Sequence, residues 1–176
     1  MADIDKERER TYQAEFIVRQ FSEREGATME LFGTKATWPV ERRFGHLDHV
    51  REYVAWIQRQ PWFVEHFPRA AAVPVKVRYR KGSRAAHYEL PATIAINAPD
   101  NKVGWAMREI VVLHELAHHV HEHEAMAGAA HGAEFRGVFC KLVTEVIGPE
   151  AGWILQITFF DSGLQVRAVQ SRADVI

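Results

Sequence analysis

The sequence predicts an α+β fold, and three observations lead to this prediction. Segments with helical spacing of apolar residues are interspersed with strand-like segments, without the strict alternation of a parallel α/β protein. The length of 176 residues favours one domain, spanning residues 1–176, with a hydrophobic core of its own. The composition, 47% hydrophobic and 26% charged, is that of a globular protein.

The first half of the chain is expected to contain two helices and a short hairpin. Residues 9–21 repeat apolar side chains every three or four positions, which predicts an amphipathic helix. Residues 28–38 predict a short hairpin. Residues 47–60 predict a second helix, with Asp48 as its N-cap and Pro61 directly after its end.

The second half is expected to supply the sheet and two long helices. Residues 73–90 alternate apolar and polar side chains around "RKGSR", which predicts a second hairpin, and residues 92–99 predict a third strand. Long helices are expected at about 104–124 and 132–147. Residues 153–169 predict two further strands around "DSG".

Charge and cysteine content exclude several classes of protein. The formal net charge of −1 gives no electrostatic case for a nucleic-acid binder or an anionic-membrane binder. The single cysteine, Cys140, can form neither an intrachain disulfide nor a four-cysteine zinc ribbon. With no signal peptide and no apolar run near the roughly 20 residues that span a bilayer, a cytoplasmic protein is expected, of no specified oligomeric state.

Six of the ten histidines lie between residues 114 and 131. His114, Glu115 and His118 form the pattern H-E-x-x-H, and residues four apart on a helix share a face. Two imidazoles at this spacing can bind one zinc ion, with the glutamate placed to act as general base on a metal-bound water. The alternatives are a zinc-free, histidine-rich helix and, for Glu115, a solvated carboxylate on the helix surface.

Two histidines leave a tetrahedral site incomplete, and His131 is the best third ligand. It opens the predicted helix at 132–147 and should share a face with Phe135, which must pack inward. Glu134, about one turn later, is the rival: it could bind the metal or accept a hydrogen bond from an imidazole N–H. Three protein ligands with an open fourth position are typical of a catalytic zinc site.

Several other residues near the pattern have alternative interpretations. His119, His121 and His123 are expected to form a solvated helix end, although His121 shares the face of His118. Tyr88 and His87 are candidates for stabilising an oxyanion, and the alternative is that they are ordinary strand residues.

"HELAHH" followed by "HGAEF" resembles the SprT-like branch of the zincin metallopeptidases, whose third ligand is the histidine of an HGxxF/W segment, here His131. The wider chain is similar to a family of small actinobacterial and phage metallohydrolases. The matching stretches are "ERTYQAE", "ERRFGHLDHVREYV", "AHYE", "VVLHELAHH", "HGAEF" and "GPEAG". The resemblance implies a zincin-like fold, in which a small antiparallel or mixed sheet packs against the H-E-x-x-H helix and further helices. It implies one zinc ion per chain; without the cysteine ribbon, DNA-linked substrates are not implied.

These observations favour a zinc metallohydrolase, most simply a metallopeptidase that acts on a peptide or protein. Its metal ligands are expected to be His114, His118 and His131, with Glu115 as general base. One alternative is a non-catalytic binding module on a zincin scaffold. The other is a repressor-cleaving peptidase of the ImmA/IrrE type, which "HGAEF" fits less well.

Overall fold

The computed structural model describes residues 7–23, 26, 28–31, 33–80, 86–97 and 107–169. Helices and strands both occur, with a small mixed sheet, so the predicted α+β class is confirmed. The chain divides into two compact units, one within Met1–Glu41 and Ala127–Val169 and the other within Arg42–Met126. No helix in the described part of the chain is long and apolar enough to cross a membrane.

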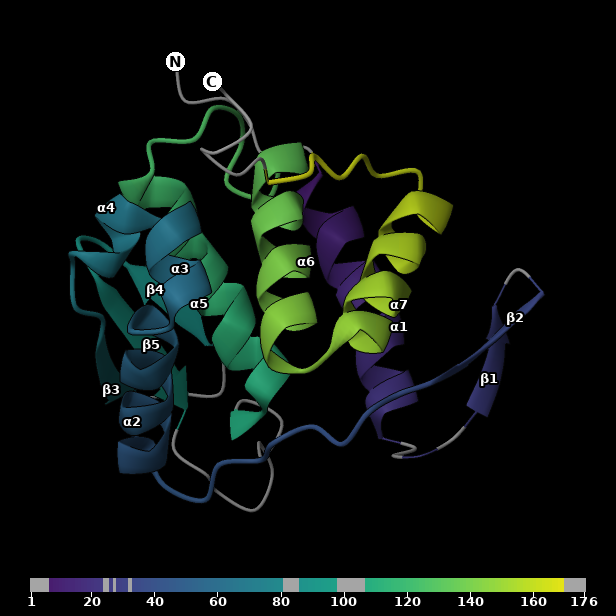
Figure 1. Ribbon diagram of the computed structural model, residues 1–176, viewed down its shortest axis with the longest axis horizontal. Helices are drawn as coiled ribbons and strands as arrows, with labels where there is room; N and C mark the ends of the chain where they lie inside the picture. Colours follow the sequence, from purple (N-terminus) through teal and green to yellow (C-terminus); the bar gives the residue numbers. More distant parts are fainter. Residues whose placement is uncertain are drawn as a thin grey trace. The chain divides into compact units, whose positions relative to one another are not determined.

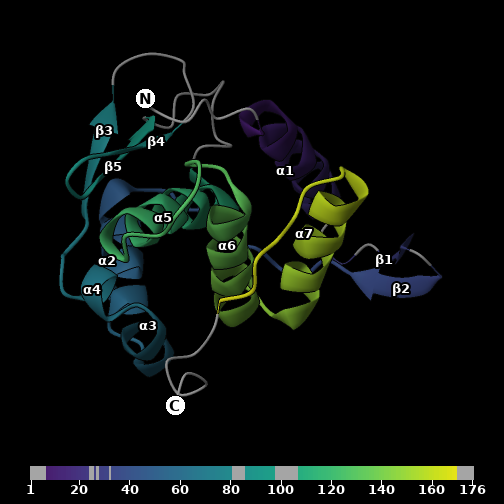
Figure 2. The same ribbon diagram turned by 90° about the horizontal axis from the view of Figure 1, so that it is seen from above.

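The first unit consists of three helices and a hairpin. Helix α7 (Pro149–Asp161) packs against both α1 (Arg8–Ser22) and α6 (Ala133–Val146), and Figures 1 and 2 show the three helices side by side. The hairpin joins β1 (Thr28–Leu31) to β2 (Thr34–Thr37) in antiparallel register, as the sequence predicts. Fully buried side chains from the three helices form the core of this unit: Ala14, Val18, Phe135, Phe139, Leu155 and Phe159.

The second unit contains a three-stranded sheet of β3 (Lys76–Arg80), β4 (His87–Glu89) and β5 (Thr93–Asn97), in the order β3-β5-β4. Strand β5 is parallel to β3 and antiparallel to β4. The predicted hairpin between β3 and β4 is therefore wrong. The physical reason is that the side chains of β5 at 94–97 are all buried. This strand therefore lies at the centre of the sheet, with β3 on one side and β4 on the other.

Helices α2 (Leu47–Gln58) and α5 (Glu109–His123) lie on the same face of this sheet (Figures 1 and 2). Two short helices that the sequence analysis did not predict follow α2: α3 (Pro61–His66) and α4 (Pro68–Ala71). Each starts with proline, whose fixed φ and missing N–H suit the first helical position.

Two helix starts differ from the predictions. His46, and not Asp48, is the N-cap of α2, because its Nδ1 accepts a hydrogen bond from the Asp48 N–H at 3.2 Å. Helix α5 starts at Glu109, later than the predicted residue 104; residues 98–106 lie outside the described part. The backbone just before α5 is extended and pairs with Arg43 through an isolated β-bridge at Arg108.

Glu109 fixes the start of α5 from a buried position. Its carboxylate accepts hydrogen bonds from the Tyr53 hydroxyl at 2.6 Å and from the Arg42 guanidinium at 2.6 Å. Burial and the neighbouring carboxylate raise the pKa of Tyr53, so its hydroxyl stays protonated and donates. A buried carboxylate needs such partners, and they hold the first turn of α5 in place.

Residues 149–161 form helix α7, so the prediction of two strands in 153–169 is wrong. The buried side chains of this segment repeat at helical spacing: Ala151, Ile154, Leu155, Thr158 and Phe159. A short, almost continuous apolar run fits either a strand or a buried helix. Here the segment is a helix because it packs against two other helices, α1 and α6. Gly163, with φ 67°, ends α7 as its N–H donates to the Phe160 carbonyl at 2.8 Å.

The extended segment after α7 lies directly on α6, with Gly137 at the point of closest approach. The Arg167 N–H donates to the Ala133 carbonyl at 2.9 Å, and a Cβ added at Gly137 would lie 1.7 Å from the Arg167 carbonyl oxygen. Only glycine allows this approach, because a side chain there would displace the segment.

Gly137→Ala is expected to lower the free energy of unfolding by about 1–3 kcal/mol, because the added methyl overpacks this contact. At a helical glycine with no close neighbour, the same change raises the free energy of unfolding by about 0.5–1 kcal/mol. The sign of the measured change therefore shows whether the close contact exists. Gly45→Ala is the control, since a Cβ there meets nothing within 4 Å. Urea unfolding followed by circular dichroism measures both; a Gly137→Ala protein at least as stable as the parent would contradict the close approach.

Candidate metal centre

Helix α5 carries His114 and His118 one turn apart, on a single face. Their Nε2 atoms lie 3.1 Å apart, and their ring centroids are 4.9 Å apart with the planes at 75°. His114 is only 3% exposed, and His118 is half-buried. The helix therefore directs both ring nitrogens to a common point.

The separation of these two nitrogens suits a shared cation. Two nitrogens bound tetrahedrally at zinc distances of about 2.0–2.1 Å lie about 3.3–3.4 Å apart. The Nε2 atoms of His114 and His118 are within a few tenths of an ångström of that spacing, at 3.1 Å. The pair could bind one ion with little rearrangement.

His131 lies just before α6, whose N-cap is Gly132. The sequence analysis expected His131 to open the helix, and the structure places it one residue before the N-cap. His131 is 5% exposed, and its ring centroid lies 5.1 Å from that of Tyr12 and 5.1 Å from that of Phe135. Aromatic packing thus holds the ring in one orientation.

His114, His118 and His131 lie close enough together to bind one metal ion. Each offers one ring nitrogen, and these atoms all lie within 4.8 Å of one another. Neutral imidazole is a ligand for zinc and for neighbouring divalent transition metals, and three of them suit such an ion better than calcium or magnesium, which take oxygen ligands. Their assignment as metal ligands stays a prediction.

Glu134 is not a member of this group among the residues that the structure describes. Its carboxylate accepts a hydrogen bond from the Arg167 guanidinium at 2.5 Å, and its Oε2 would be the nearest atom to a Cβ at Gly128. The side chain is therefore engaged with the loop and the C-terminal segment. This favours His131 over Glu134 as the third ligand.

Glu115 is a buried carboxylate, only 4% exposed. The alternative of a solvated side chain on the helix surface is therefore wrong. Burying a carboxylate costs free energy unless ion pairs or hydrogen bonds compensate for the lost hydration. On the chain it directly follows His114, the first residue of the histidine pair.

His119 corrects the expectation of a solvated helix end. It is fully buried, its Nε2 donates to the Ala70 carbonyl at 3.0 Å, and its Nδ1 lies 3.2 Å from the Tyr88 hydroxyl. Burial lowers the pKa of His119 to about 4, so the ring is neutral near pH 7. His121 is partly buried, and its Nε2 has no hydrogen-bond partner in the part of the chain described.

Tyr88, a candidate for stabilising an oxyanion, is engaged in packing α5 onto the sheet. Its hydroxyl lies within hydrogen-bonding distance of the Pro91 carbonyl, of His119 Nδ1 and of His123 Nε2, at 2.5, 3.2 and 3.4 Å. Burial raises the pKa of Tyr88 to about 12, which keeps the hydroxyl protonated. These contacts favour the alternative interpretation, an ordinary strand residue.

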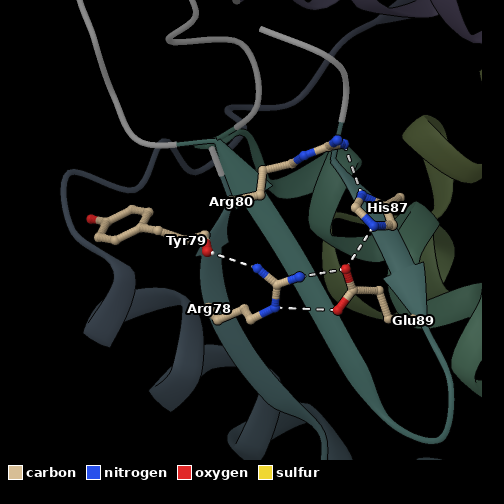
Figure 3. A network of polar contacts seen from close by, with 5 residues as sticks. All are labelled: Arg78, Tyr79, Arg80, His87 and Glu89. Atoms are coloured by element: carbon tan, nitrogen blue, oxygen red, sulfur yellow. Dashed lines mark hydrogen bonds and ion pairs between the residues drawn. The ribbon is translucent and has the colours of Figure 1, made fainter. Parts of the chain in front are cut away.

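His87, the other oxyanion candidate, belongs to a polar network on the sheet (Figure 3). It precedes Tyr88 in a strand, so its side chain lies on the face of the sheet opposite to α5. Its Nε2 donates to Glu89 at 2.8 Å, and its Nδ1 accepts from Arg80 at 2.8 Å, while Arg78 donates to Glu89. His87 therefore points away from α5, the helix that carries His114 and His118.

A cavity of about 660 Å³ lies in the first unit, along α7 and the extended segment that follows it. Its lining consists of Ala133, Gln156, Phe160, Gly163, Leu164, Gln165, Val166, Arg167 and Ala168. None of the three histidines or Glu115 lines it, so it is not evidence for a substrate site at the metal centre.

Three residues that support His131 were missed by sequence reasoning. Thr11 and Arg136 both donate hydrogen bonds to the His131 carbonyl, at 3.5 and 2.6 Å, and Tyr12 packs on its ring. Thr11 and Tyr12 are about 120 positions away in the sequence. Arg136, five residues after His131, could have been noticed as a charge on an otherwise inward-facing helical stretch.

Comparison with known proteins gave no match: the chain matches no protein-family model, no curated protein and no solved structure. The family resemblance of "HELAHH" and "HGAEF" stays a prediction.

His131→Ala is expected to lower zinc affinity much more than Glu134→Gln does. Losing a ligand removes a metal–nitrogen bond, whereas losing a hydrogen-bonding neighbour of a ligand typically costs about 10–100-fold. Competition with a chromophoric chelator measures both affinities. A larger loss in Glu134→Gln than in His131→Ala would reverse the assignment and make Glu134 the ligand.

Proposed function

We propose that the protein is a zinc-dependent metallohydrolase with a zincin-like fold, and that it cleaves peptide bonds. The observation that carries the proposal is the group of three imidazoles within 4.8 Å of one another, with the buried Glu115 directly after the first. The packing of the H-E-x-x-H helix against a small mixed sheet supports the zincin-like assignment.

Zinc is the proposed metal because of the donor set. Imidazole nitrogens bind zinc at about 2.0–2.1 Å, and three histidines are a known ligand set of catalytic zinc sites. The protein offers His114, His118 and His131, all three at least partly shielded from water. Burial favours the neutral form of imidazole, which is the form that binds metal.

A catalytic role is proposed over a structural one for two reasons. Structural zinc sites usually have four protein ligands, whereas the group found among the described residues has three. A structural site also has no need of a buried carboxylate beside a ligand, and Glu115 is such a carboxylate. Both observations argue against a binding module that merely uses the scaffold.

Glu115 is assigned the proton transfers. When bound, the zinc ion would supply Lewis-acid polarisation of the scissile carbonyl and lower the pKa of its water towards 7. Glu115 accepts a proton from the attacking water as the new C–O bond forms. It then gives this proton to the leaving nitrogen as the C–N bond breaks, which restores the carboxylate.

The peptide substrate is proposed by analogy, because a helix-borne H-E-x-x-H site is most often found in peptidases. The rival assignments share the scaffold and differ in activity. A binding module would hold the metal without turnover, and a repressor-cleaving peptidase would cleave a particular folded protein in preference to short peptides.

Purified, untagged protein is expected to contain about one zinc ion per chain, and His114→Ala or His118→Ala should lose most of it, because two remaining ligands bind weakly. His49→Ala is the matched control, since His49 is an exposed histidine of α2 outside the group. Elemental analysis by mass spectrometry gives the metal content. Native protein without zinc, and without uptake after zinc is added, would contradict the proposal.

Glu115→Gln is expected to keep zinc and the fold but to lower the rate of peptide cleavage by about 10²–10⁴-fold, the usual contribution of a general base. Glu122→Gln, an exposed carboxylate of the same helix, is the control. Turnover of a peptide library and zinc content are measured on each variant. Release of zinc by Glu115→Gln would make Glu115 a ligand, and no turnover by the zinc-loaded parent would favour the binding module.

A further inference from the structure

Arg136 is fully buried, which is rare for arginine because removing its charge from water is costly. Its guanidinium donates to the carboxylate of Glu7 at 2.8 Å and to the carbonyl of Gln165 at 2.7 Å. It also donates to the His131 carbonyl at 2.6 Å and to the Thr11 hydroxyl at 3.3 Å. The side chain thus joins α1, α6, the segment after α7 and the residue proposed as the third metal ligand.

His131 needs such support because it lies outside the helix. The loop before it contains Ala125 and Gly128, both with positive φ (51° and 91°), and the first residue of α6 is Ala133. The His131 carbonyl precedes the N-cap of α6, Gly132, and the charged N–H of Arg136 donates to it.

We propose that Arg136 is a positioning residue for the metal centre. It holds the backbone of His131, so that the imidazole is already in its metal-binding position in the metal-free protein. This inference rests on the proposed function, since it takes His131 as a ligand. Two features of the contact make it specific. The planar guanidinium reaches four different acceptors at once, which a lysine ammonium on a flexible stem cannot do at the same geometry. The contact is to the backbone of His131, so it fixes where the residue sits, while Tyr12 and Phe135 fix the ring.

A purely structural role for Arg136 makes a different prediction. If the side chain only ties α1 to α6, breaking its ion pair with Glu7 should lower zinc affinity as much as breaking its hydrogen bond to the His131 carbonyl. Glu7 is the partly exposed end of the network, with 42% of its side chain accessible, so Glu7→Gln removes the ion pair while leaving the guanidinium and the His131 carbonyl in place.

The test compares Arg136→Lys with Glu7→Gln in the full chain, using zinc affinity by chelator competition and the visible spectrum of the cobalt(II)-substituted protein. Arg136→Lys is expected to lower zinc affinity about 10–100-fold, as for other residues that orient a metal ligand. It should also change the cobalt(II) absorption, which reports coordination geometry. Glu7→Gln should leave the affinity within about threefold, since a partly exposed ion pair contributes little, and should leave the cobalt spectrum unchanged.

If Arg136→Lys does not fold, Thr11→Val carries the test. It removes a hydroxyl that bonds both Arg136 and the His131 carbonyl, and is expected to lower zinc affinity about 2–10-fold. The inference would be overturned if the variant that folds had the same zinc affinity and cobalt spectrum as a zinc-binding parent. The proposed metal centre would still stand in that case. Equal losses in Arg136→Lys and Glu7→Gln would also overturn it and leave a structural tether. A parent protein that binds no zinc would overturn the proposed metal centre, and the inference with it.

Discussion

The rotation of α5 about its own axis is the constraint on which the candidate site depends. One turn of helix brings the Nε2 atoms of His114 and His118 to 3.1 Å, but a rotation of about 100°, one residue's worth, would turn both rings away. The buried side chains of α5 set this rotation: Ile110, Leu113, Ala117 and Val120 among them. Glu109 fixes where the helix starts, because its carboxylate is bound by Tyr53 and Arg42. The sheet and α2 thus provide the surface against which α5 takes one orientation.

In each unit a buried charged side chain holds a segment that bears a proposed ligand. Glu109 does so at the start of α5, and Arg136 does so beside His131. Buried ion pairs are a weak source of stability, because desolvation offsets most of their attraction. In the part of the chain that the structure describes, each charge has one exposed or partly exposed counter-ion, Arg42 for Glu109 and Glu7 for Arg136. Apolar residues of similar volume could fill these positions, so the charges are better explained by the geometry that they impose on the backbone.

The sequence predicted what local periodicity determines. Helices α1, α2 and α6, the hairpin of β1 and β2, and the facing pair of histidines all follow from spacing within about ten residues. The strand order β3-β5-β4 did not follow, because alternation shows that a strand exists and not which strand lies beside it. Helix α7 was mistaken for strands because its apolar run packs against two helices and has little polar face. The support of His131 was also missed, since Thr11 and Glu7 reach it, directly or through Arg136, from about 120 positions away.

The histidine cluster on α5 contains two pairs with different roles. His114 and His118 form one pair at four-residue spacing, and His119 and His123 form another, with ring centroids 4.4 Å apart. The second pair is offset from the first by five residues, which places it about 140° around the helix. There it contacts Tyr88 of β4 and the Pro91 carbonyl in the turn between β4 and β5. With its pKa lowered to about 4 by burial, His119 is a neutral core residue that donates to the Ala70 carbonyl. The number of histidines is therefore a poor guide to a metal site; the face of the helix on which each one lies separates the proposed ligands from the histidines that anchor α5.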